Sequence, residues 1–273
     1  MSKELVKPGT SALGAILGTG TIGFEERPDF IPEGDKSGTE GITQDDIRLP
    51  RLGIAQGLSP QLTPGDSQFI DGLRMFEMFN DTTKDVYGNG PLYFIIVRRD
   101  VKCIEFRPRS EGGGIVDMNV PRNDKRVTDW RDAQEPGGKR LPPPATLFNE
   151  YIAMLIKADG ELEPIVISIK NTNKYNRRAA TDLNGYIKMY ASQGKKSVPL
   201  YGVIYSIKSK FEKNDNGTFG VPVFTAEGFI PKTQPEMFEK VKAYAESLAD
   251  KEVTIQREPG DDDFDFEAEV VKK

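Results

Sequence analysis

The most informative feature of this 273-residue sequence is an absence, because it contains no histidine at all. Histidine is the commonest general base and metal ligand in proteins, and it activates the nucleophile in Ser-His and Cys-His sites. Its absence excludes most hydrolase mechanisms and leaves only carboxylate, lysine or tyrosine chemistry for an enzyme. We therefore expect a binding protein rather than an enzyme, with no metal and no other cofactor.

Cysteine and long apolar runs are also scarce. The single cysteine, Cys103, excludes an internal disulfide, and its position in an apolar strand pattern indicates a core residue rather than a reactive thiol. No apolar run approaches the roughly 18 residues needed to cross a bilayer, and glycines break the apolar stretch near the N-terminus that a signal peptide would need. We expect a soluble, cytoplasmic protein without a membrane partner, located in the host cytoplasm if it is viral.

Composition divides the chain into three parts. Residues 1–45 are rich in Gly, Pro, Thr and acidic residues and lack periodicity, which predicts a flexible N-terminal arm. The arm contains GTGTIG at 18–23, a formal match to the dinucleotide-binding fingerprint, but the prolines and glycine that follow prevent the helix that such a site requires. Residues 46–256 are expected to form the folded body, and residues 257–273 a disordered acidic tail.

Most of the body has a β pattern. Pro50 suits an edge strand, and residues 91–109 predict two strands that turn near Arg99-Asp100. Asp159-Gly160 predicts a hairpin turn, although the first arm of that hairpin, 147–155, also fits helical spacing and is left ambiguous. A second hairpin is predicted to turn at residues 214–217.

Two amphipathic helices accompany these strands. The pattern over 176–194 places Ala179, Leu183, Tyr186, Ile187 and Tyr190 on one face and basic residues on the other. A C-terminal helix is predicted to begin with the Thr233-x-x-Glu236 capping spacing, with an apolar stripe formed by Phe238, Val241, Tyr244, Ala245 and Leu248. Short strands with one intervening basic helix favour a mainly β (α+β) fold built as a small closed or partly open barrel.

Charge is distributed unevenly along the chain. The net charge is −5, and residues 258–273 hold seven acidic residues and two lysines, so the tail accounts for the whole imbalance. Between Ser168 and Lys213, ten basic residues stand against two acidic ones. Such a stretch can be merely a solvated basic face, which is the alternative to a binding surface.

Aromatic residues are interleaved with these bases, and this combination is typical of proteins that bind single-stranded nucleic acid. Cations contact the phosphate backbone, and rings stack on the bases. Tyr186 and Tyr190 fall on the apolar side of their helix, whereas Tyr201 and Tyr205 are divided between core and stacking roles. A basic group in the first hairpin extends the candidate surface. The candidate nucleic-acid-binding residues are Lys170, Lys174, Tyr175, Arg177, Arg178, Lys188, Lys195, Lys196, Tyr201, Tyr205, Lys208, Lys210, Phe211, Arg98, Arg99 and Arg107.

The acidic tail has a chemistry of its own, because DDDFDF at 261–266 places two phenylalanines among aspartates. The aspartates attract basic surfaces, and Phe264 or Phe266 can then fill an apolar pocket on a partner protein. The tail can also occupy the basic surface of its own body until nucleic acid displaces it. A plain solubilising end is the alternative.

A β-rich body followed by such a tail resembles phage-type single-stranded DNA-binding proteins. The resemblance rests on DDDFDF and, more loosely, on PIVISIKNTNKYNRRAATDLNGYI at 164–187. It implies an OB-like five-stranded barrel with long insertions that binds and protects single-stranded DNA, without strong sequence preference, during replication, recombination and repair. It also implies recruitment of a polymerase, helicase or primase through Asp261, Asp262, Asp263, Phe264, Asp265 and Phe266. The sequence departs from the bacterial pattern because EAEVVKK follows Phe266. A homo-oligomer stays open.

Two other classes remain as alternatives. A virion structural or scaffold protein would also suit a β-rich body with a loose arm. A metal-dependent nuclease would suit DGELEPIVISIK, in which acids precede a strand that ends in a lysine. That site requires an acid two residues before Lys170, where this sequence has Ser168.

Overall fold

The computed structural model describes residues 49–107, 113–128, 144–171, 174–192, 198–214 and 217–248, and this part of the chain is mainly β. It contains two antiparallel sheets and the helices α2 (Lys125–Thr128), α3 (Lys174–Ala191) and α4 (Pro235–Ser247). None of these helices has the length and apolar character required to span a membrane. The predicted arm and tail, residues 1–45 and 257–273, lie outside the described residues.

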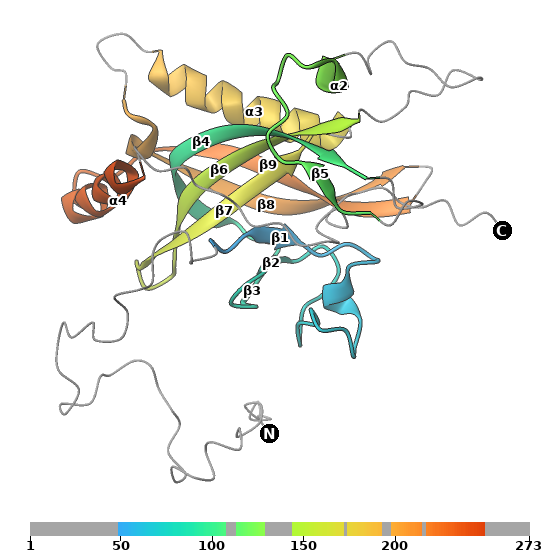
Figure 1. Cartoon of the computed structure of the whole chain (residues 1–273). Coiled ribbons are helices and arrows are strands. Elements are labelled where there is room, and N and C mark those ends of the chain that lie inside the picture. The colour runs from blue at the N-terminus through green and yellow to red at the C-terminus, as the bar shows by residue number, and fades with distance from the viewer. Residues whose placement is uncertain are drawn as a thin grey trace, which may run out of the picture. The chain divides into compact units, whose positions relative to one another are not determined.

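The large sheet has a Greek-key arrangement. Its five long strands are β4 (Leu92–Phe106), β6 (Ala145–Ile156), β7 (Leu162–Lys170), β8 (Val203–Asn214) and β9 (Gly217–Phe229). Their order in the sheet is β7-β6-β4-β8-β9, and the short β5 (Ile115–Asp117) pairs with the end of β4. Along the chain, β4, β6 and β7 form three neighbouring antiparallel strands. After helix α3 (Figure 1), strand β8 returns to pair with β4, which gives the Greek-key order.

The described strands form no closed barrel, because β7 and β9 are the two ends of the strand order. The small sheet of β1 (Leu52–Ile54), β2 (Met78–Asn80) and β3 (Val86–Gly88) contributes the segment that lies between them. Arg51 forms a parallel bridge with Val166 of β7. The Gln56 side chain accepts a hydrogen bond from Gly220 N (2.9 Å) and donates one to Gly220 O (3.3 Å) on β9. The predicted OB-like five-stranded barrel is therefore not confirmed, and segment 51–56 contacts both edges instead.

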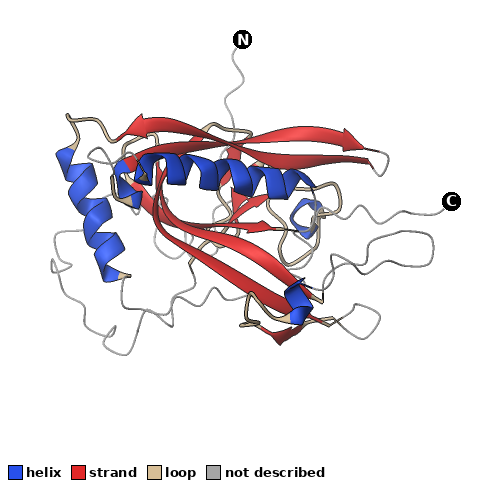
Figure 2. Ribbon diagram, turned by 90° about the horizontal axis from the view of Figure 1, so that it is seen from above, coloured by secondary structure: helices blue, strands red, loops and turns tan. Residues whose placement is uncertain are grey.

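Helices cover both faces of the large sheet, since alternate residues of a strand point to opposite faces. Phe94 and Ile96 belong to the main core, which α3 covers with Leu183 and its neighbours. The intervening Ile95 packs in a second cluster under α4, together with Val241 and others. Figure 2 shows α3 lying along the sheet and α4 at one end of it. The predicted apolar faces of both helices are confirmed by this packing.

Strand β4 is longer than predicted. It runs without a turn from Leu92 to Phe106, so the turn expected at Arg99-Asp100 is wrong. Register with β6 continues through both residues, after a bulge between Ile96 and Arg98. Asp100, which was predicted to lie in the turn, instead forms an ion pair along the strand, with its Oδ2 atom 2.9 Å from Arg98 Nε.

The other local predictions can be compared directly. Segment 147–155, which was ambiguous, lies in strand β6, and Gly160 forms the predicted turn with φ +87° and a hydrogen bond to Lys157 O. The second hairpin also forms, with Asn214 opposite Gly217. The predicted capping box of α4 does not form, because Gln234 is the N-cap and makes no side-chain capping hydrogen bond.

Candidate nucleic-acid interface

The first turn of α3 contacts the tip of the β8–β9 hairpin through two aromatic rings. The Tyr175 and Phe219 ring centroids lie 5.0 Å apart in an edge-to-face arrangement. Lys174 Nζ lies 4.9 Å from the centroid of the Tyr175 ring, within the range of a cation–π contact. Residues that are far apart in the sequence are thereby joined into one basic and aromatic surface.

Strand β8 brings further cations to the same place. Residues directly paired across an antiparallel ladder present their side chains on the same face. Lys208 pairs with Val223, Lys210 with Val221 and Glu212 with Phe219, so both lysines share a strand face with Phe219. Phe211 and Lys213 alternate to the opposite face of the hairpin. We call this set the basic end: Lys174, Tyr175, Arg177, Arg178, Lys208, Lys210, Phe211 and Lys213.

Electrostatics at the basic end favour an anion. The first turn of α3 contains no acidic residue, although the N-terminus of a helix carries the positive end of its dipole. Lys174, Arg177 and Arg178 are exposed there, so positive charges add to the dipole. A phosphate at this point would interact favourably with both.

Among the described residues, carboxylates lie beside Arg178 and Lys210. Asp182 Oδ2 lies 3.7 Å from Arg178 Nε, and Glu212 Oε1 lies 2.9 Å from Lys210 Nζ. Both pairs are well exposed, and such surface pairs contribute little stability. These exposed pairs therefore leave Arg178 and Lys210 able to attract a phosphate.

Lys170 lies in a separate aromatic cluster. It pairs with Phe148, which belongs to the strand face of Ile152 and therefore to the side of the sheet that α4 covers. Lys170 Nζ lies 5.5 Å from the Phe106 ring centroid and 5.9 Å from that of Phe148. This second aromatic and basic cluster is separate from the basic end.

Arg98 and Arg99, two of the predicted arginines, form hydrogen bonds that connect the sheet to α4 and α3. Arg98 donates a hydrogen bond to Leu248 O (3.1 Å), just after the end of α4, in addition to its ion pair with Asp100. Arg99 donates to Asn184 Oδ1 on α3 (2.8 Å) and to Asn149 Oδ1 on β6 (3.2 Å). Their guanidinium groups are engaged by protein oxygens, so we no longer count them as the core of a phosphate-binding surface.

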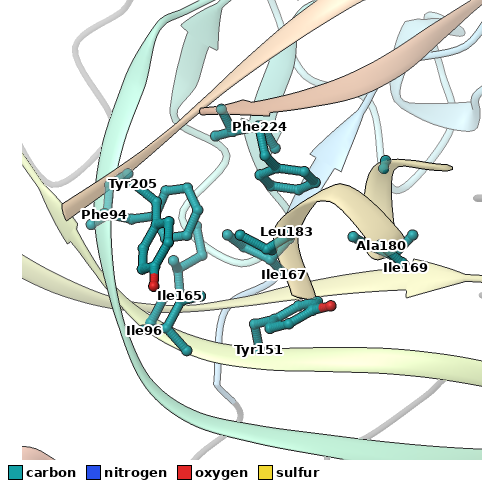
Figure 3. Packing of buried hydrophobic residues seen from close by; sticks show 14 of the residues in the cluster. Phe94, Ile96, Tyr151, Ile165, Ile167, Ile169, Ala180, Leu183, Tyr205 and Phe224 are labelled. Atoms are coloured by element: carbon teal, nitrogen blue, oxygen red, sulfur yellow. The ribbon is translucent and has the colours of Figure 1, made fainter. Parts of the chain in front are cut away.

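The two tyrosines that the sequence left between core and stacking roles both pack inside the protein. Tyr205 is only 1% exposed and stacks on Phe94, with ring centroids 5.8 Å apart (Figure 3). Its burial raises the pKa of the phenol to about 12. Tyr201 packs against Phe238 of α4, with centroids 5.7 Å apart. The expectation that Tyr205 takes part in base stacking is wrong, because its ring has no accessible face.

The remaining predicted residues are dispersed. Lys188 is exposed on the C-terminal half of α3, away from the first turn, and Arg107 is exposed just after the end of β4. Lys195, Lys196 and residues 261–266 lie outside the described residues. The sequence reasoning missed Phe76, which contacts the hairpin tip near Gly220. No local signal marks Phe76, since its neighbour comes from a distant part of the chain.

The described residues offer little for metal chemistry. Asp100 and Glu150 pair directly across β4 and β6, and Glu150 pairs with Ser168 of the strand considered for a nuclease. Asp100 is held by Arg98, and the described part of the chain has no group of three or more Cys, Asp or Glu side chains placed to hold a metal ion.

The fold and the site thus define a mainly β protein with a Greek-key sheet and a basic, aromatic surface at one end of it. The chain belongs to the family of Pam3 phage gp34-like proteins, whose family model matches residues 19–254. This membership supports the expected link to bacteriophages. No match to the chain was found among curated proteins or among solved structures.

Proposed function

We propose that this protein binds single-stranded DNA, without strong sequence preference, through the basic end. The observation that carries the proposal is the contact between Tyr175 and Phe219, which joins the first turn of α3 to the β8–β9 hairpin. Scattered charges would be only a solvated face, but this contact joins the cations of α3 to those of β8, on the hairpin that also carries the exposed Phe211. That combination suits a phosphate backbone whose bases are exposed.

The strand order supports this proposal. OB folds are five-stranded, partly open Greek-key barrels that bind oligonucleotides. We propose that β4, β6, β7, β8 and β9 form a divergent, open version of such a barrel, in which segment 51–56 occupies the position between β7 and β9. Fold alone does not define function, so the weight of the proposal rests on the basic end.

The biological role that we propose follows from this binding and from the phage family. The protein would cover and protect DNA strands exposed during replication, recombination and repair. Its acidic segment, 261–266, would recruit a polymerase, helicase or primase by charge attraction and by its two phenylalanines.

A salt titration tests the proposed function. Fluorescence anisotropy of labelled oligo-dT, and of a duplex of the same length, is measured over a series of salt concentrations. We expect tighter binding to the single strand, a log affinity that falls by about 0.7 per contacted phosphate for each tenfold rise in salt, and no cleavage when magnesium is added. Absence of binding at low salt, preference for the duplex, or cleavage of the strand would each overturn the proposal.

A further inference from the structure

The most exposed aromatic ring at the basic end belongs to Phe211. Its side chain is 68% exposed, although it lies within a regular strand between Lys210 and Glu212. A single exposed apolar side chain is common on protein surfaces. An exposed ring that lies near a second aromatic residue on the same face of a strand instead indicates a binding site.

That neighbour is Phe76. Phe211 pairs directly with Gly220, so their side-chain positions share one face of the hairpin. A β-carbon added to Gly220 would lie 3.3 Å from Phe76 Cδ1 and only 2.8 Å from Ile54 Cγ2. Gly220 is therefore required for this close approach, because a larger residue would clash with Ile54, and it places Phe76 on the face of the hairpin that carries Phe211.

The backbone holds Phe76 in an unusual conformation. Its φ angle is +70°, in the left-handed region that aromatic residues rarely adopt. Phe76 N donates a hydrogen bond to Ala55 O (2.7 Å), which anchors it to the chain just after β1. Strained residues of this kind cluster at binding sites, because the surrounding structure fixes their orientation in advance.

Cations flank the two rings. Lys213 lies two residues after Phe211 and therefore on the same strand face, and Lys210 precedes it on the face that carries Phe219. Aromatic rings flanked by cations can bind one nucleotide. The ring stacks on the base, and the cation contacts the phosphate.

We propose that Phe211 and Phe76 form a base-stacking site for single-stranded DNA. This inference rests on the proposed function, and it extends the path of the strand from the α3 side of the hairpin around its tip to the Phe76 side.

Replacement of Phe211 tests the stacking site. In F211A the affinity for oligo-dT should fall roughly tenfold or more, with an unchanged salt slope because no charge is lost. F211W should retain binding, and F76L should weaken it in the same way as F211A. The matched control is F229A, because Phe229 is 52% exposed but lies at the opposite end of β9 against Tyr190. Quenching of 2-aminopurine placed in the oligonucleotide should be reduced in F211A and F76L but not in F229A.

The outcomes separate the stacking site from the proposed function. If K210A lowers the salt slope while F211A binds like the wild type, the strand is bound but the stacking site is wrong. If the wild type does not bind oligo-dT at all, the proposed function itself is wrong. If F211A leaves affinity unchanged and instead alters the sedimentation coefficient, the two rings form a contact between copies of the chain, which also overturns the inference.

Discussion

The two ends of the large sheet use their cations in opposite ways. At the end covered by α4, Arg98 bonds to Leu248 O and Asp100, above an apolar cluster that includes Val241. At the basic end, Lys174 and Lys210 project from a helix start and a hairpin strand, and the nearby Phe211 is largely exposed. A cation that contacts protein oxygens contributes to folding. A cation held beside exposed rings contributes little to stability, and we propose that it contacts the ligand.

The largest expected effect comes from removing cations at the basic end. In the triple variant K174A/R177A/K210A, three phosphate contacts are lost, so the salt slope should fall by about 2 and the affinity for oligo-dT near 0.1 M salt by about 100-fold. The midpoint of urea unfolding should hardly change, because these side chains are exposed. Anisotropy titrations and urea denaturation measure the two effects.

A matched triple variant makes this comparison sharper. K188A/K232A/K240A removes the same charge from exposed positions away from the hairpin tip. It should keep nearly the wild-type slope, because distant charges are screened at moderate salt. Equal losses in the two triple variants would show that net charge, rather than the basic end, determines binding.

The next effect is one of stability. R98A leaves Leu248 O without its charged donor and Asp100 without its partner, so the free energy of unfolding should fall by about 2 kcal/mol. Affinity for oligo-dT should stay at the wild-type value. Urea denaturation followed by circular dichroism measures the first quantity, and a variant that is as stable as the wild type would contradict the structural role of Arg98.

A smaller effect concerns alkaline pH. Burial raises the pKa of Tyr205 to about 12 in the native state from 10.0, so above pH 10 the unfolded chain loses a proton that the native protein keeps. Stability is therefore lost as the pH rises from 10 to 12. In Y205F the loss between pH 10 and 11 should be smaller by at most about 1 kcal/mol. Thermal unfolding at several pH values measures this, and identical profiles would contradict it.

The smallest effect concerns the acidic tail. Deletion of residues 258–273 removes seven acidic residues and two lysines. If these residues compete with DNA for the basic end, low-salt affinity should rise a few-fold, and the rise should vanish at high salt. Unchanged affinity at every salt concentration would leave the tail with a role in solubility or in partner recruitment alone.

Short-range sequence patterns correctly predicted the buried face of α3 and the hairpin turn at Gly160. The periodicity of Ala179, Leu183 and Ile187 located the buried face of α3, because helical spacing alone determines which residues share a face. The turn at Gly160 was predictable for the same reason, since a glycine with positive φ suits a tight turn.

Features that depend on distant partners could not be predicted. Arg99-Asp100 resembles a turn locally, but Arg99 is satisfied by Asn149 and Asn184, which come from other elements. Tyr205 alternates correctly for a strand, yet only the packing of α3 decides which face of that strand is buried. At the candidate site the sequence identified the cations of α3 and β8, whereas the position of Phe76 beside Gly220, the residue that pairs with Phe211, depends on tertiary structure.

The most direct test of the account is the salt dependence of oligo-dT affinity, measured side by side for the wild type, K174A/R177A/K210A and K188A/K232A/K240A. We predict a steep slope for the wild type and the second triple variant, and a slope smaller by about 2 for the first. Three equal slopes, or no binding by the wild type at low salt, would contradict the claim that the basic end binds single-stranded DNA.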